Sequence, residues 1–137
     1  MDYKQEVFDG VNGIDILLCG DTLTRVCHGL AHSSGWWTDL KTGEDLREHD
    51  NEMEKLMLVV TEVAEAAEGY RKDLADDKIP HRKMVEVELA DAVIRIFDLA
   101  GAKGYDIGGA IAEKLVFNST REDHKLENRK KEGGKRL

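Results

Sequence analysis

The sequence contains a single proline and no long apolar run, and each shortage limits what the chain can be. With Pro80 as its one proline, the chain can form helices that run without interruption. Its longest apolar run is LMLVV at residues 56–60, which is far too short to span a bilayer. The opening segment MDYKQEVFDG lacks the basic and apolar regions of a signal peptide. We therefore expect a cytoplasmic protein with no membrane partner.

Cysteine is scarce as well. Cys19 and Cys27 fall on one predicted helix and do not have the spacing of metal ligands, so we expect two reduced thiols packed as small apolar side chains. His28 and His32 lie one helical turn apart, as in zinc helices, but Gly29 stands where that motif requires glutamate. The sequence therefore predicts no zinc site.

Basic residues are outnumbered, and their distribution is uneven. The net charge is −8, yet residues 1–113 hold 12 basic and 24 acidic side chains, whereas residues 114–137 hold 8 and 4. A body this acidic is a poor partner for nucleic acid. The basic tail, from about residue 122, either solubilises the chain or meets phosphate groups of a small ligand.

Apolar residues recur at helical spacing in four segments, and no segment shows the alternation of a strand. Pro80 suits the first position of the third helix, and Asp106 can cap the fourth. A chain of 137 residues has room for one domain. We predict an all-α, four-helix bundle forming one domain over residues 1–137, with helices at 15–31, 50–74, 80–100 and 107–120.

The second and third predicted helices each carry an apolar seam with the period of bundle packing. Because both helices also have apolar residues on other faces, we expect a homo-oligomer, a dimer or a tetramer, that buries the remaining surface. The seams comprise Leu56, Val60, Val63, Ala67 and Tyr70, followed by Val87, Ala90, Ile94 and Phe97.

Two acid pairs at i, i+3 interrupt the apolar surface of these helices, Glu62 with Glu65 and Glu88 with Asp91. The spacing lets both carboxylates of a pair reach one cation, but in a chain with 28 acidic residues chance produces such pairs equally often. The apolar setting is more informative, because burying unpaired carboxylates is costly. Carboxylates alone select hard cations, with Mg²⁺ first and Mn²⁺ or Ca²⁺ behind it. The alternative is that Asp91 pairs with Arg95 and the other acids meet lysines or water.

The ordered set EVAE, ELAD and KLVFNSTREDH, within a stretch from about Gly35 to the C-terminus, resembles the MazG-like members of the all-α nucleoside triphosphate pyrophosphohydrolases. This superfamily also includes dimeric dUTPases and dCTP pyrophosphatases. The resemblance implies Mg²⁺-dependent hydrolysis of nucleoside triphosphates to a monophosphate and pyrophosphate. The metal ligands it implies are Glu62, Glu65, Glu88 and Asp91.

The same resemblance implies contacts to the triphosphate from Lys114 and Asn118, and Arg121 continues their stripe on the fourth helix. The family has a further acid just before its first pair, where this chain has Thr61, so the base that aligns water is Glu62 or Glu65. In the HSSGWW loop, Trp37 could stack on a base, and His32 could face the same pocket. Packing roles for both residues remain alternatives.

Two other functions fit the same sequence. A non-catalytic helical bundle could bind a nucleotide or a partner helix without Mg²⁺. A purely structural protein would hold its embedded acids in ion pairs, and neither chelator nor Mg²⁺ would then change its stability.

Overall fold

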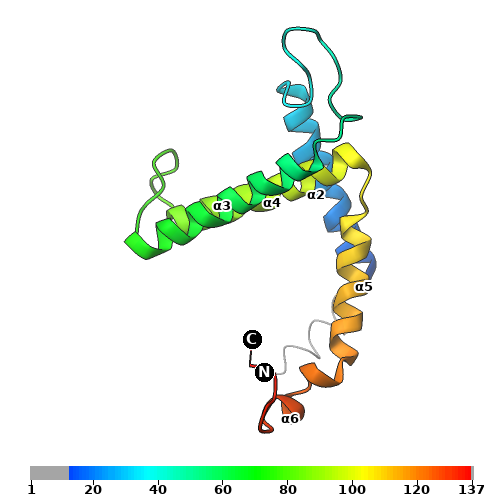
Figure 1. Ribbon diagram of the computed structural model, residues 1–137, viewed down its shortest axis with the longest axis vertical. Coiled ribbons are helices and arrows are strands. Elements are labelled where there is room, and N and C mark those ends of the chain that lie inside the picture. The colour runs from blue at the N-terminus through cyan, green and yellow to red at the C-terminus, as the bar shows by residue number, and fades with distance from the viewer. Residues whose placement is uncertain (1–12, 137) are drawn as a thin grey trace. The chain divides into compact units, whose positions relative to one another are not determined.

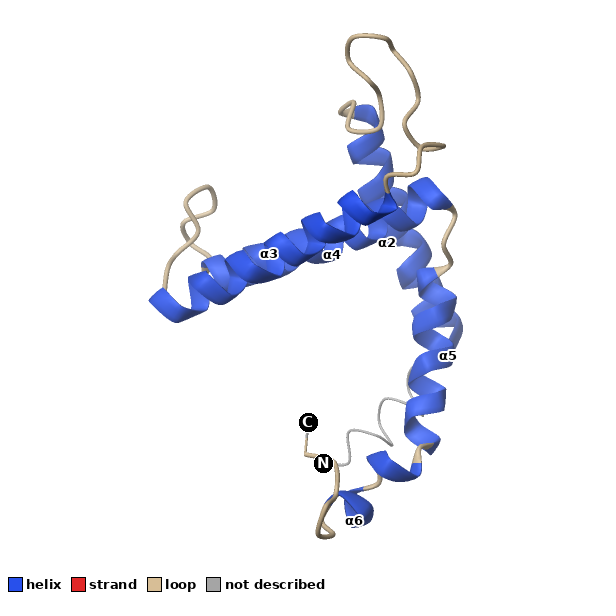
Figure 2. Cartoon of the chain, in the orientation of Figure 1, coloured by secondary structure: helices blue, strands red, loops and turns tan. Residues whose placement is uncertain are grey.

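The computed structural model describes residues 13–136, and within them the chain is all-α (Figure 1). Residues 1–12, where the sequence predicts no signal segment, lie outside this range. The described part contains no strand (Figure 2), but it has two isolated β-bridges, Thr38–Asp45 and Ala75–Lys83. None of its helices is long and apolar enough to cross a membrane. The main helices are α2 (Gly13–Ser33), α3 (Glu52–Lys72), α4 (Met84–Lys103) and α5 (Ile107–Thr120), followed by η1 (Glu122–His124) and α6 (Leu126–Arg129).

These bounds confirm the four predicted helices, and the predicted side-chain cap of the fourth is present. The side chain of Asp106 caps α5 by accepting a 2.7 Å hydrogen bond from the backbone N–H of Gly109. Gly104 ends α4 in the left-handed conformation, with φ of 72°, and its N–H donates to the carbonyl of Ala100.

The start of α4 is a correction, because Pro80 does not begin this helix. The buried carboxylate of Asp76 accepts hydrogen bonds from the backbone N–H groups of Lys78, at 3.0 Å, and Ile79, at 2.6 Å. This turn holds Pro80 in the loop, and the Ala75–Lys83 bridge closes it. The helix therefore begins at Met84, four residues later than Pro80.

The chain forms two units, and their boundary falls inside α2 between residues 21 and 22. The central unit contains residues 22–105. The described part of the terminal unit contains residues 13–21 and 106–136. The prediction of one domain with a basic tail stays a prediction. Both thiols are free, that of Cys19 exposed and that of Cys27 buried.

In the central unit, α3 and α4 lie side by side as an antiparallel pair (Figure 1). Gly69 allows the close approach, since a Cβ atom there would lie 2.8 Å from Cγ of Met84. Lys103 joins α4 to the loop before α3 by donating hydrogen bonds to the carbonyls of Arg47, at 2.7 Å, and His49, at 2.6 Å. The buried residues of the pair are Glu62, Ala66 and Gly69 of α3 and Ala92, Phe97, Leu99 and Ala100 of α4.

The predicted apolar seam of α3 does not pack against α4, which is a second correction. Leu56, Val60 and Val63 are 49%, 54% and 50% exposed, and Tyr70 is 79% exposed. The face that carries Glu62 is buried in their place. Because α3 has small or apolar residues on both faces, its period alone could not identify the packed face.

In the terminal unit, the beginning of α2 meets the beginning of α5 through two glycines. A Cβ atom on Gly108 would lie 2.9 Å from the carbonyl oxygen of Leu17 and 3.2 Å from Cα of Gly20. Backbones this close leave no room for a side chain at either position. Gly20 and Gly108 are therefore packing residues.

Candidate metal centre

Two matched stripes of side chains face each other along α3 and α4. In each stripe successive members are separated by three, four and three residues, which keeps them on one face of a helix. Since the helices are antiparallel, the acidic end of one stripe meets the acidic end of the other. The stripes are Lys55, Leu58, Glu62 and Glu65 on α3, and Glu88, Asp91, Arg95 and Asp98 on α4.

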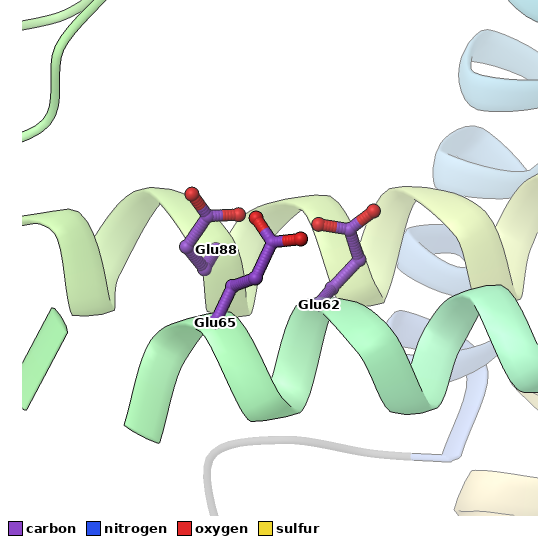
Figure 3. A group of neighbouring side chains, drawn as sticks. All are labelled: Glu62, Glu65 and Glu88. Carbon is purple, nitrogen blue, oxygen red and sulfur yellow. The ribbon is translucent and has the colours of Figure 1, made fainter. Parts of the chain in front are cut away.

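Three carboxylates meet at the acidic end. Glu62, Glu65 and Glu88 each contribute one oxygen atom to a group in which all three lie within 4.8 Å of one another. Figure 3 shows Glu62 and Glu65 rising from α3 toward the side on which Glu88 leaves α4. Glu62 is buried, Glu88 is half-buried and Glu65 is exposed. A set of oxygen ligands that opens to solvent on one side suits a hard divalent cation that keeps some of its water.

Asp91, the fourth predicted ligand, is not a member of this group. It is half-buried, and it lines the cavity described below. Its charge still acts on the cluster, because it helps to raise the pKa of Glu88. The structure thus brings together three of the four predicted carboxylates.

Arg95 neutralises the most buried member of the cluster. Its Nε donates to Oε1 of Glu62 over 2.5 Å, while its own side chain remains 42% exposed. The predicted alternative paired Arg95 with Asp91 one turn before it, but the hydrogen-bonded partner is on the neighbouring helix. The guanidinium occupies a position where a metal ion could also neutralise Glu62.

The carboxylates repel one another, and Glu88 shows the effect. Burial, a hydrogen bond with Glu62 and the charges of Glu65, Glu62 and Asp91 raise the pKa of Glu88 to about 6, from an ordinary value of 4.5. All of these causes favour the protonated form. A cation bound among the three carboxylates would have the opposite effect.

A cavity of about 600 Å³ adjoins the other end of the two stripes. Its walls come from the second half of α2, the loop that follows it, the first half of α3 and the middle of α4, all in the central unit. Most of the lining is apolar, with two acidic and two basic side chains among it. The lining consists of Val26, Cys27, Leu30, Ala31, Ser34, Trp36, Lys55, Leu58, Asp91, Ile94, Arg95 and Asp98.

Asp98 is held firmly at the wall of this cavity. Its Oδ1 accepts the indole N–H of Trp37 at 2.7 Å and lies 2.9 Å from Nδ1 of His28. An indole N–H can only donate, so this oxygen acts as an acceptor. The ammonium group of Lys55 lies 4.3 Å from the centre of the Trp37 ring.

The two residues predicted to bind a base, Trp37 and His32, are not among the residues that line this cavity. Trp37 is fully buried beside Asp98. His32 is exposed, its ring centre is 5.8 Å from that of His28, and it is not among the residues that line the cavity. Trp36, which is 71% exposed, lines the cavity. Trp36, Lys55 and Asp98, which line the cavity, are not among the site residues predicted from the sequence, although the repeated spacing of the two stripes was a usable signal for the last two.

The predicted phosphate-binding residues belong to the terminal unit. Lys114 and Arg121 flank the ring of Phe117, at 4.8 and 5.9 Å from its centre. Arg121 lies one residue beyond α5 and forms a bidentate pair with Asp123, at 2.9 and 2.7 Å. The side-chain oxygen of Asn118 is buried and accepts no hydrogen bond from the described residues. Asn118 therefore has an unused acceptor, while the charge of Arg121 is already paired.

No family model, curated protein or solved structure matches this chain. Its own residues must therefore indicate what it does.

Proposed function

We propose that the protein is a Mg²⁺-dependent pyrophosphohydrolase that cleaves nucleoside or deoxynucleoside triphosphates to the monophosphate and pyrophosphate. Such an enzyme would control nucleotide pools or remove aberrant nucleotides. The observation that carries the proposal is the three-carboxylate cluster on α3 and α4, which adjoins a largely apolar cavity. A cluster that holds a cation suits the phosphates of a nucleotide, and the adjoining cavity suits its organic part. The resemblance to MazG-like proteins supports the same conclusion.

In this proposal Glu62, Glu65 and Glu88 hold the metal, with Asp91 as the neighbouring fourth carboxylate. Bound Mg²⁺, or Mn²⁺ in its place, supplies charge for the phosphoryl oxygens and lowers the pKa of a water molecule. Glu65 is better suited than Glu62 to accept the proton of the attacking water, because it is exposed while Arg95 occupies an oxygen of Glu62. The oxygen of water joins one phosphorus atom, and the α–β bridging oxygen leaves with the other phosphoryl group.

The remaining charge of the triphosphate is assigned to Lys114, Asn118 and Arg121. The Lys114 ammonium group suits this role, because within the described residues it contacts the ring of Phe117 and forms no ion pair. Arg121 would exchange Asp123 for a phosphate oxygen, which offers the same bidentate geometry. Asn118 would contribute its amide N–H groups.

The proposed reaction is tested by incubating the protein with each common dNTP and Mg²⁺ and identifying the products. We expect pyrophosphate and the monophosphate, and we expect Glu65→Gln and Asp91→Asn to lower kcat/KM at least 100-fold. Glu68→Gln is the matched control, since Glu68 is a helical acid on α3 that, among the residues the structure describes, forms its ion pairs with nearby Arg71 and Lys72. Full turnover by the Glu65 variant would remove the carboxylate cluster from the mechanism.

A second copy of the chain is the partner proposed for the outer face of α3. This face presents Leu56, Val60, Val63 and Tyr70 to solvent, all at least 49% exposed. Their spacing of four and three residues is that of helices that pack lengthwise on an equivalent helix. A homodimer or tetramer would bury this stripe.

A non-catalytic nucleotide-binding bundle is the second candidate, and the Arg95–Glu62 pair favours it. This pair satisfies Glu62 without any metal ion. Under this alternative, Mg²⁺ and chelator would leave the melting temperature unchanged, nucleotide would raise it, and no pyrophosphate would appear.

A further inference from the structure

We propose that Asp98 selects the substrate by its base, favouring bases that carry an exocyclic amino group, such as cytosine and adenine, over those with a carbonyl group at that position. The inference rests on the proposed function, because it treats the cavity as the base pocket of the same site. It adds a specificity-determining residue that is not among the site residues predicted from the sequence.

The position of Asp98 suits contact with a base rather than with phosphate. Asp98 belongs to the same α4 stripe as Glu88, the α4 member of the carboxylate cluster, and it follows Glu88 by ten residues. On a helix that separation is about 15 Å. A ligand whose phosphates lie at the carboxylate cluster would therefore extend its far end along the stripe toward Asp98.

The orientation of the Asp98 carboxylate is fixed from behind. Trp37, which is fully buried, and His28 approach the same oxygen, Oδ1, at 2.7 and 2.9 Å. The other oxygen, Oδ2, accepts no hydrogen bond from the residues that the structure describes, and Asp98 lines the cavity. One acceptor at the cavity wall is thus left for a ligand, and its direction is set by two neighbours.

A carboxylate oxygen at this position discriminates between bases by the partial charge of the exocyclic group that faces it. It accepts an N–H from an amino group, whereas a carbonyl oxygen in the same place would meet a like partial charge and leave Oδ2 without a donor. Cytosine and uracil differ in just this way at one ring position, as do adenine and hypoxanthine. Sites that reject a ligand by leaving a buried polar group unpaired are highly selective.

Trp36 completes the pocket on the solvent side. It is 71% exposed and lines the cavity, so its indole can stack on a base whose edge faces Asp98. Stacking tolerates any base, and the cavity of about 600 Å³ admits purines and pyrimidines alike. The choice between bases therefore falls to the polar group at the wall.

The test compares dCTP with dUTP, and dATP with dITP, as substrates of the full chain with Mg²⁺. We expect the amino-bearing member of each pair to have a kcat/KM roughly 10- to 100-fold higher, as one hydrogen bond to a charged group provides. Equal kcat/KM values within both pairs would overturn the inference without affecting the proposed hydrolysis.

The Asp98→Asn variant tests whether the Asp98 carboxylate causes this preference. Trp37 and His28 would keep the amide oxygen on their side and turn the amide nitrogen toward the cavity, so the acceptor becomes a donor. We expect the dCTP/dUTP ratio to fall at least tenfold, or to invert, with Asp77→Asn, an exposed loop residue, as the control. Equal losses on both substrates would show a structural role and overturn the inference.

Binding measurements keep the two proposals separate. If the wild-type chain hydrolyses no nucleoside triphosphate, the proposed function fails, and calorimetric titration with dCTP and dUTP then decides the inference. Tighter binding of dCTP, lost in Asp98→Asn, would support selection by Asp98. Equal or undetectable binding of the two nucleotides would overturn it.

Discussion

Nε of Arg95 lies 2.5 Å from Oε1 of Glu62 and joins α4 to the buried carboxylate of α3. Glu62 is only 7% exposed, so its charge needs a cation nearby. In the metal-free chain the guanidinium provides it, on the same oxygen-rich surface that the proposed Mg²⁺ would occupy. If the cluster binds the proposed cation, this pair would link the stability of the α3–α4 pair to that binding.

Removing this cation should destabilise the metal-free protein. We expect Arg95→Gln to lower the free energy of unfolding by about 1–3 kcal/mol in chelator, because Glu62 is left buried and unpaired. Added Mg²⁺ should restore part of the loss, and urea denaturation with and without Mg²⁺ measures both. Arg71→Gln breaks an exposed pair with Glu68 and should cost under about 1 kcal/mol. An Arg95 variant as stable as this control would contradict the expectation.

The raised pKa of Glu88 predicts how stability depends on pH in chelator. The folded chain keeps the proton on Glu88 up to about pH 6, whereas the unfolded chain releases it near the ordinary value of 4.5. Folding therefore takes up a proton between these values, and the contribution of Glu88 is fully present below about 4.5 and lost as pH rises through about 6. Denaturation curves across this range should show the decline in wild type, and Glu88→Gln should remove it. If the free energy of unfolding of the variant declined with pH as steeply as that of wild type, another group would be responsible for the decline.

Gly20 and Gly29, both on α2, should respond in opposite directions to the same substitution. Gly20→Ala places a methyl group against the backbone of Gly108, so we expect a loss of about 1–3 kcal/mol. Gly29 has nothing within 4 Å of an added Cβ atom, so Gly29→Ala should stabilise the helix by up to about 1 kcal/mol. Thermal melts followed by circular dichroism compare the two. A neutral Gly20→Ala would mean that α2 and α5 do not approach closely in solution.

The exposed stripe of α3 should control self-association. Val63→Glu introduces a charge into an apolar face that is half exposed in the single chain, so we expect dissociation with little change in helix content. Thr61→Glu adds the same charge on another exposed face of α3 and serves as the control. Sedimentation velocity would measure the association state of each. A wild-type chain that sediments as a monomer would remove the second copy from the proposal.

The sequence predicted the helices well because their signals are local. Asp106 caps the helix that follows it, Gly104 ends the helix that precedes it, and the apolar period identifies each helix between such signals. Pro80 gave a wrong start for α4 because the carboxylate of Asp76 accepts hydrogen bonds from the backbone of the turn between these two residues. That contact depends on how the loop closes, which no local pattern encodes.

By itself, the sequence determined an all-α chain and placed carboxylates within the apolar surface of two helices. Only the tertiary structure decided which faces meet. Spacing fixes which residues share a face, but packing and register decide which partner that face touches. For this reason Glu62 is buried while Val63 is exposed, and Arg95 pairs with Glu62 instead of with Asp91. Likewise Trp37 is enclosed beside Asp98, while Trp36 is exposed at the cavity.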